Sequence, residues 1–136
     1  MLYYINEKKS YNGETYNDYP KSVKKAISFL FNSNIFNFNL AVHTKAPLSG
    51  ILSDVLGDNV CKQLTNKKLF QHDKGTIGLI TEKIAPIHQY DIIACFISYG
   101  YLKKLIRSYP NVNIIYIPWT EEEEREISTN RDFTKL

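Results

Sequence analysis

The stretch "DIIACFIS" (Asp91–Ser98) decides the fold class of this chain of 136 residues. It is apolar almost throughout and rich in isoleucine, which is typical of a strand that is buried on both faces of a sheet. The segment after it carries Leu102, Leu105, Ile106 and Tyr109 at the spacing of an amphipathic helix. A buried strand followed by such a helix predicts a unit of a mostly parallel α/β sheet.

The same alternation extends outward in both directions. Further strands are expected at Leu2–Ile5, Phe38–Thr44, Thr76–Ile80 and Val112–Trp119. Further helices are expected after Asp18-Tyr19-Pro20, over Ile51–Leu56 and Asp58–Leu64, and after Thr120. We therefore expect one α/β domain over residues 1–136: a three-layer sandwich, Rossmann- or flavodoxin-like, with a mostly parallel sheet of four to five strands.

Two connections are less regular. Asn12-Gly13 is interpreted as part of a polar loop. The link "TEKIAPIHQY" (Thr81–Tyr90) joins two expected strands with ten residues, which is near the minimum for a parallel crossover. We expect either a one-turn helix in this link or an antiparallel direction for one of the two strands.

Composition excludes several classes of protein. The net charge of +3 comes with lysines in scattered pairs, whereas a nucleic-acid-binding protein usually has a concentrated basic face, so nucleic acid is not favoured. Cys61 and Cys95 belong to no CxxC pair or Cys/His cluster, so we predict buried reduced thiols, no metal site and no cofactor. There is no signal-peptide pattern and no apolar run of roughly 18 residues, which predicts a cytoplasmic protein without membrane association.

Ligands of open α/β sheets bind beyond the carboxyl ends of the strands. At one such end, "HTKAPLSG" (His43–Gly50) places His43 and Lys45 on the same side of a strand. Ser49 and Gly50 would open the next helix, whose free N–H groups favour an anion. The stretch is neither GxGxxG nor GxxxxGK[ST]. The alternative is an ordinary turn, with Ser49 as a helix cap and Lys45 in solvent.

Ser98 and Tyr99 follow the deciding strand and allow the same two interpretations. Ser98 would either contact a ligand or cap the following helix, and it lacks the GxSxG context of a hydrolase nucleophile. The ring of Tyr99 would either stack on a flat ligand group or pack against the protein.

The stretch "NIIYIPWTEEEEREI" (Asn113–Ile127) ends the last expected strand and begins the last helix. Thr120 and Glu123 have the spacing of a capping box, which accounts for most of the glutamate run. Capping needs neither Trp119 nor Glu121, and both are placed at the ligand edge. If the protein is a catalyst, His43 and Glu121 are the acid/base candidates.

In outline, a buried strand that ends in Ser98, a helix that starts "YL" and a final strand before an acidic helix are similar to TIR and deoxyribosyltransferase-like domains, which act on N-glycosidic bonds. TIR enzymes carry their critical glutamate on the helix that follows such a strand. Here that helix reads "YLKKLIRSY" and contains no glutamate. The resemblance is therefore one of fold and does not transfer an activity.

Two functions remain open from the sequence. The first is binding of a nucleotide-like or other anionic small molecule at the carboxyl edge, with or without transferase or hydrolase activity, through His43, Lys45, Ser49, Gly50 and the later edge residues Ser98, Tyr99, Trp119 and Glu121. The second is a non-enzymatic interaction module, such as an inhibitor, an immunity or regulatory protein, or a homodimer. Its support is the high tyrosine content, 10 residues, because tyrosine suits interaction surfaces.

Overall fold

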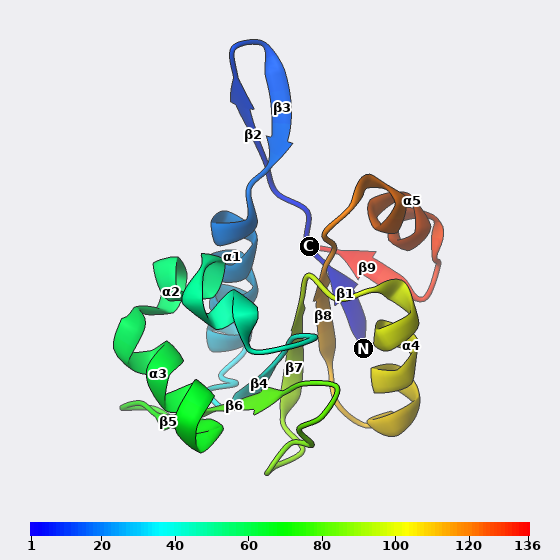
Figure 1. Cartoon of the computed structure of the whole chain (residues 1–136). Helices are drawn as coiled ribbons and strands as arrows, with labels where there is room; N and C mark the ends of the chain where they lie inside the picture. Colours follow the sequence, from blue (N-terminus) through cyan, green and yellow to red (C-terminus); the bar gives the residue numbers. More distant parts are fainter.

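A seven-stranded sheet lies between two layers of helices in the computed structural model, which describes residues 1–136 (Figure 1). Its strands are β1 (Leu2–Tyr4), β4 (Phe38–Ala41), β5 (Leu69–Gln71), β6 (Thr76–Ile80), β7 (Asp91–Cys95), β8 (Ile114–Ile117) and β9 (Phe133–Lys135). Their order is β5-β6-β4-β7-β8-β1-β9, and every pair is parallel except β5 with β6. The expected three-layer α/β sandwich is confirmed. The sheet has more than four to five strands because β5 and β9, three residues each, are too short to show a periodic pattern.

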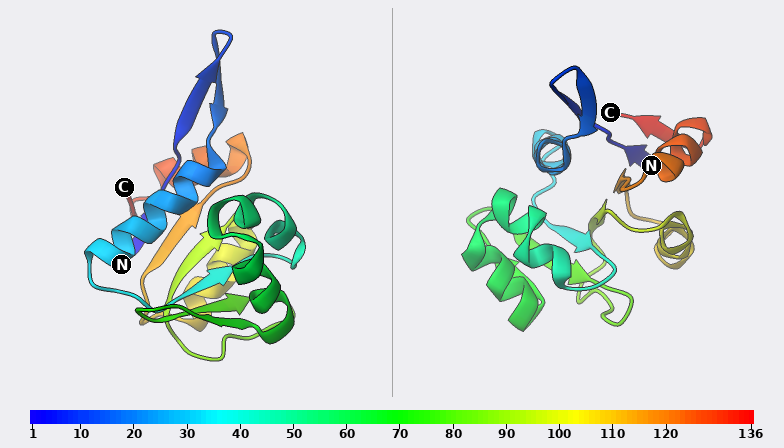
Figure 2. Two further views of the ribbon diagram at one scale, coloured as in Figure 1. Left: turned by 90° about the vertical axis from the view of Figure 1, so that its left-hand side faces the viewer. Right: turned by 45° about the horizontal axis from the view of Figure 1, so that its top comes forward.

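The helices divide between the two faces of the sheet (Figures 1 and 2). The helices α1 (Tyr19–Asn32), α2 (Ile51–Leu56) and α3 (Asp58–Lys67) pack on one face, together with the short 3-10 helix η1 (Ala46–Ser49). The helices α4 (Tyr99–Ser108) and α5 (Glu121–Thr129) pack on the other. As expected, α1 begins with Asp18, whose carboxylate accepts from the Lys21 N–H at 3.1 Å. The helix expected at this point is therefore present, and the cap at Asp18 is a finding of the structure.

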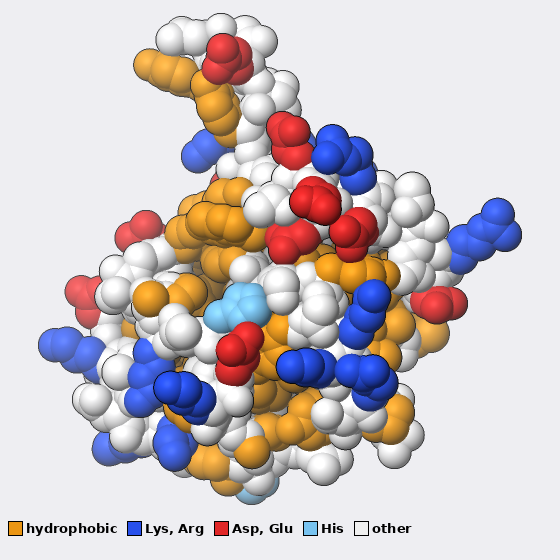
Figure 3. Space-filling model, turned by 45° about the vertical axis from the view of Figure 1, so that its right-hand side comes forward, with side chains coloured by type: hydrophobic (Ala, Val, Ile, Leu, Met, Phe, Trp, Pro, Cys, Tyr) orange, Lys and Arg blue, Asp and Glu red, His pale blue; other side chains and the backbone are white.

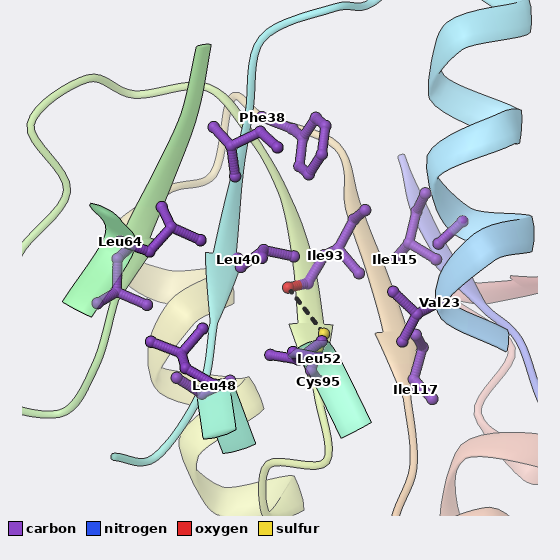
Figure 4. Packing of buried hydrophobic residues seen from close by; sticks show 14 of the residues in the cluster. Val23, Phe38, Leu40, Leu48, Leu52, Leu64, Ile93, Cys95, Ile115 and Ile117 are labelled. Carbon is purple, nitrogen blue, oxygen red and sulfur yellow. Dashed lines mark hydrogen bonds between the residues drawn. The ribbon is translucent and has the colours of Figure 1, made fainter. Parts of the chain in front are cut away.

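Alternate residues of the strands enter two separate cores. On the first face, Leu40 of β4 and Ile93 of β7 pack against Leu52 of α2 and Val23 of α1 (Figure 4). On the second face, Ala94 and Tyr116 pack beneath α4 and α5. Full burial of a leucine or isoleucine side chain contributes roughly 1.5–3 kcal/mol, so these paired layers hold the sheet between the helices.

The neighbouring strands β4 and β7 mark a reversal in the winding of the chain. After β4 the chain turns to the first face and forms η1, α2 and α3. After β7 it turns to the opposite face and forms α4. In open α/β sheets such a reversal opens a crevice beyond the strand ends, because the two connections diverge there.

The link between β6 and β7 differs from both sequence-based expectations. Residues 81–90 form no helix, and β6 and β7 are each parallel to β4, which lies between them. The link is held instead by a bridge between Thr81 and Ile84 and by Asn39, whose Nδ2 donates to the His88 carbonyl at 2.8 Å. Gly78 on β6 makes this possible, because a Cβ there would collide with the Asn39 side chain.

The predicted polar loop around Asn12-Gly13 is a β-hairpin. Its strands β2 (Lys8–Tyr11) and β3 (Glu14–Asn17) project from the carboxyl edge of the main sheet (Figures 1 and 2). Asn12 and Gly13 have φ of 52° and 78°, and two positive φ angles are the requirement of a tight I′ turn. The Lys8 Nζ fixes the base of the hairpin by a 2.6 Å ion pair with Glu124. Elsewhere in the fold, no helix is both long and apolar enough to cross a membrane.

Candidate functional site

The carboxyl edge of the sheet carries three cavities in a row that share walls. The central cavity, about 320 Å³, lies at the reversal between β4 and β7 and is lined by His43, Pro47, Gly50, Ile51, Cys95, Phe96 and Trp119. Trp119 also lines the hairpin-side cavity of about 500 Å³, together with Lys8, Lys9, Tyr16 and Glu121. His43 also lines the link-side cavity of about 330 Å³, together with Lys45, Glu82 and Lys83. Hydrophobic residues thus predominate in the lining of the central cavity, and polar or charged residues in the lining of the two cavities beside it.

His43 bridges the two strands that bound the central cavity. Its Nε2 accepts the Ser98 backbone N–H at 2.8 Å, and its Nδ1 lies 2.7 Å from Oε1 of Glu82. Because a backbone N–H can only donate, Nε2 is the acceptor, and the ring proton sits on Nδ1 and is donated to Glu82. Both ring nitrogens are therefore occupied by the protein, and His43 holds the ends of β4, β6 and β7 together.

Three aromatic rings form the wall between the central and hairpin-side cavities. Trp119 stacks on Tyr19 with ring centroids 4.6 Å apart and an interplanar angle of 21°. The Tyr19 hydroxyl donates to the Trp119 carbonyl at 2.8 Å. The Phe96 ring packs edge-on against Tyr19 at 5.2 Å and tilted against Trp119 at 5.3 Å. Since 45% of Trp119 remains exposed, its indole is available for contact with a ligand.

Phe96 adopts a backbone conformation that is costly for its residue type. Its φ of 61° lies in the left-handed region, which bulky side chains rarely occupy. Strained residues of this kind cost about 1–3 kcal/mol and cluster at binding and catalytic sites. This conformation turns the chain from β7 toward α4, and the Phe96 ring lies in the wall of the central cavity.

Cys95 is the last residue of β7 and lines the central cavity. Burial raises the pKa of its thiol to about 12, and the Sγ lies 3.8 Å from the Ile93 carbonyl (Figure 4). The thiol therefore stays protonated near neutral pH and acts as an apolar wall, since the thiolate is the reactive form of cysteine. Cys61 is likewise free and buried, as the sequence predicted.

Ser98 and Tyr99 take the packing roles that the sequence left as alternatives. The Ser98 Oγ accepts the Tyr101 N–H at 3.2 Å and caps α4. The Tyr99 hydroxyl accepts from Asn130 Nδ2 at 2.6 Å, and Lys103 lies 4.8 Å from the centre of its ring. Neither side chain lines any of the three cavities at the edge.

The predicted helix start at Ser49-Gly50 is interrupted by η1. Ser49 ends η1, and its Oγ donates to the Ala46 carbonyl at 3.0 Å, so it does not cap α2. Gly50 precedes α2 and lines the central cavity. Lys45 reaches the C-terminal end of α3 and donates to the Thr65 carbonyl at 2.7 Å. Ser49 and Lys45 are thus held by backbone carbonyls instead of meeting at one anion site.

The capping box of α5 is present as expected. The Thr120 Oγ1 accepts the Glu123 N–H at 3.2 Å, and the Glu123 Oε1 accepts from the Thr120 and Trp119 N–H groups at 3.1 Å. Glu121 takes no part in this network and faces the hairpin-side cavity. Because His43 lines the central and link-side cavities, the two acid/base candidates do not share a cavity.

Several residues of the site were not singled out from the sequence. Glu82 was given no role in the sequence-based site, and Phe96 gives no sequence signal of its positive φ. Lys9 and Tyr16 belong to the hairpin, which the Asn-Gly pair between alternating residues could have revealed. No group of three or more His, Cys, Asp or Glu side chains is arranged to hold a metal ion.

Comparison of the chain with protein-family models, with curated proteins and with solved structures finds no match. Inferences about function therefore come from the geometry of the site alone.

Proposed function

We propose that this protein binds a small molecule made of a flat ring and an anionic group, of which a nucleotide is the representative. The observation that carries the proposal is the central cavity at the reversal between β4 and β7, walled by Phe96 and Trp119. Its volume of about 320 Å³ falls at the lower end of the roughly 300–1,000 Å³ typical of ligand pockets.

The walls of the central cavity suit the ring. Ile51 and Pro47 on one side and Phe96 and Trp119 on the other are apolar or aromatic. Stacking of a nucleic-acid base on an aromatic side chain contributes about 1–3 kcal/mol, and it tolerates different bases because each has a π-face. Tyr19 holds the indole of Trp119 in place, so little side-chain freedom is lost on binding.

The cavities on either side suit the anionic group. Four lysines line them, and two of these are already engaged: Lys8 with Glu124 and Lys45 with the Thr65 carbonyl. Lys9 on the hairpin side and Lys83 on the link side have no partner within the protein. A ring in the central cavity can therefore direct a phosphate or carboxylate toward either lysine.

The proposal concerns binding and assigns no reaction. A general base needs a free lone pair within hydrogen-bond reach of the proton that it removes. Both His43 nitrogens are occupied, and the Cys95 thiol stays protonated near neutral pH. Glu121 lies in a different cavity from both of them.

A thermal-shift measurement with a matched pair of variants tests the proposal. Nucleoside monophosphates should raise the melting temperature of the protein, because ligands that bind only the folded state stabilise it. Ile51→Tyr enlarges a side chain on the cavity wall and should abolish the rise. Ile87→Tyr makes the same change at a surface position, 51% exposed, and should keep it. If nucleoside monophosphates leave the melting temperature of the original chain unchanged, the proposal is contradicted.

One observation favours the interaction module as a second candidate. Tyr11 and Tyr16 on the projecting hairpin are 69% and 44% exposed, and an isolated two-stranded hairpin is only marginally stable in water. Exposed tyrosines on such an element are typical of a protein interface. Sedimentation of the purified chain and of the double variant Tyr11→Ser/Tyr16→Ser tests self-association: an oligomer dissociated by the variant supports an interface, and monomers in both cases exclude a homodimer.

A further inference from the structure

A fourth cavity, of about 300 Å³, lies on the α4 side of the sheet, beside the link that follows β6. The link forms no helix, and its residues 81–85 line one part of the cavity while α4 lines another. Its apolar part is made by Ile80, Ile84 and Leu105, and its rim by Lys83, Lys104 and Tyr109. We call it the α4 cavity.

Tyr101 lines the α4 cavity, and its hydroxyl is buried and has no partner within the protein. The residue is 9% exposed, and its hydroxyl oxygen has no hydrogen-bond partner in the protein. A buried polar group without a partner costs about 1–3 kcal/mol, which is why such groups usually have one. Every other buried side-chain nitrogen and oxygen in this protein is paired, so the Tyr101 hydroxyl stands apart.

This hydroxyl is a hydrogen-bond donor over the whole physiological range. Burial, together with the nearby Glu82 and Tyr109, raises the pKa of Tyr101 to about 12. The phenol therefore keeps its proton and can give it in a hydrogen bond to an oxygen acceptor. Two ammonium groups on the walls, Lys83 and Lys104, favour an acceptor with negative charge.

We propose that the α4 cavity is a second binding site, for a small carboxylate with an apolar body, in which the Tyr101 hydroxyl donates to the carboxylate. The body would occupy the space against Ile80 and Leu105, and the lysines would balance the charge. Glu82 is the one acidic group on the walls, and its carboxylate already accepts from His43 at 2.7 Å.

The α4 cavity is separate from the central cavity. His43 lines the central cavity but not the α4 cavity, and its ring packs against the Tyr101 ring at a centroid distance of 5.1 Å. The pair of rings forms a wall between the two spaces. The α4 cavity does share Glu82, Lys83 and two neighbouring residues with the link-side cavity, so Tyr101 and not Lys83 distinguishes the two proposed sites.

Benzoate is a suitable probe, and benzamide is its uncharged counterpart. In ¹H–¹⁵N NMR spectra of the full chain, benzoate should shift the amides of residues 81–85 and 101–105 saturably and more strongly than benzamide. Tyr101→Phe removes only the hydroxyl and should weaken benzoate binding roughly tenfold, as expected for a hydrogen bond to a charged group. Tyr90→Phe removes a tyrosine hydroxyl outside the cavity lining, so it is the matched control and should leave the affinity unchanged.

The stability of the ligand-free variant gives a second readout. Removing an unpartnered buried hydroxyl should leave the melting temperature of Tyr101→Phe equal to or above that of the original chain. The inference is overturned by a loss of stability in Tyr101→Phe, by equal affinity of Tyr101→Phe and Tyr90→Phe, or by an absence of saturable shifts in residues 81–85. Shifts confined to residues around Trp119 would also overturn it, while agreeing with the separate site in the central cavity.

Discussion

The Ser98 backbone N–H donates to the His43 Nε2 at 2.8 Å and joins the ends of β4 and β7 at the reversal of the winding. This bond defines the tautomer of the ring, because Nε2 must keep a lone pair and Nδ1 must carry the proton. Long-range ¹H–¹⁵N NMR of the imidazole should therefore show the Nδ1-protonated form at neutral pH. Detection of the Nε2-protonated form would contradict the bridge.

Loss of the His43 side chain should destabilise the edge of the sheet. His43→Ala leaves the Ser98 N–H and the Glu82 carboxylate without their partner, and we expect the free energy of unfolding to fall by about 2 kcal/mol. Glu82→Gln keeps an oxygen acceptor for Nδ1 and should cost less. Urea denaturation of the three proteins measures the difference, and equal stability of His43→Ala and the original chain would refute the structural role.

The residues at the start of α5 should differ sharply in their contribution to stability. Thr120→Ala removes one half of the capping box and should lower the free energy of unfolding by about 1 kcal/mol. Glu122→Ala is the control, because Glu122 is exposed and takes no part in the cap. Denaturation curves that show the same loss for both variants would argue against the capping box.

The protein should lose stability in alkali. Cys95 and Tyr101 have pKa values raised to about 12 from ordinary values of 9.0 and 10.0. Between about pH 9 and pH 12 the folded chain therefore holds protons that the unfolded chain has released, so the free energy of unfolding falls as pH rises. Each pKa unit corresponds to about 1.4 kcal/mol. Urea denaturation at pH 7 and pH 10.5 should show the fall, with a smaller fall for Tyr101→Phe; identical curves at the two pH values would disprove it.

The two cysteines should resist modification in the folded protein. Both are buried, and burial raises the pKa of each thiol. A disulfide reagent that reports free thiols should react slowly at pH 8 and then with both thiols once urea unfolds the chain. Rapid reaction of one equivalent of the reagent with the folded protein would show that a thiol is accessible.

Local signals predicted much of the fold. The apolar run Asp91–Ser98, the helix start at Asp18-Tyr19-Pro20 and the box at Thr120 and Glu123 each lie within a few residues, and each is present in the structure. The hairpin also had a local signal in Asn12-Gly13, which its polar surroundings obscured.

The arrangement of the site could not be predicted from local sequence patterns, because it is formed by contacts between residues far apart in the chain. His43 lies 39 residues from Glu82 and 55 from Ser98 along the chain, and only the strand order β6-β4-β7 brings them together. Both predictions for the link after β6 were wrong, because Asn39 and Gly78 allow it to lie against the sheet without a helix. Short-range periodicity carries no information about such packing.

The chain has a single tryptophan, Trp119, so its fluorescence reports on the central cavity and on the hairpin-side cavity that it also lines. The most direct measurement is its emission, excited at a wavelength that spares tyrosine, during a titration with adenosine monophosphate. We predict a saturable change in the original chain and in Ile87→Tyr, and none in Ile51→Tyr. An emission that stays constant in the original chain, or that changes equally in both variants, would contradict binding at the reversal between β4 and β7.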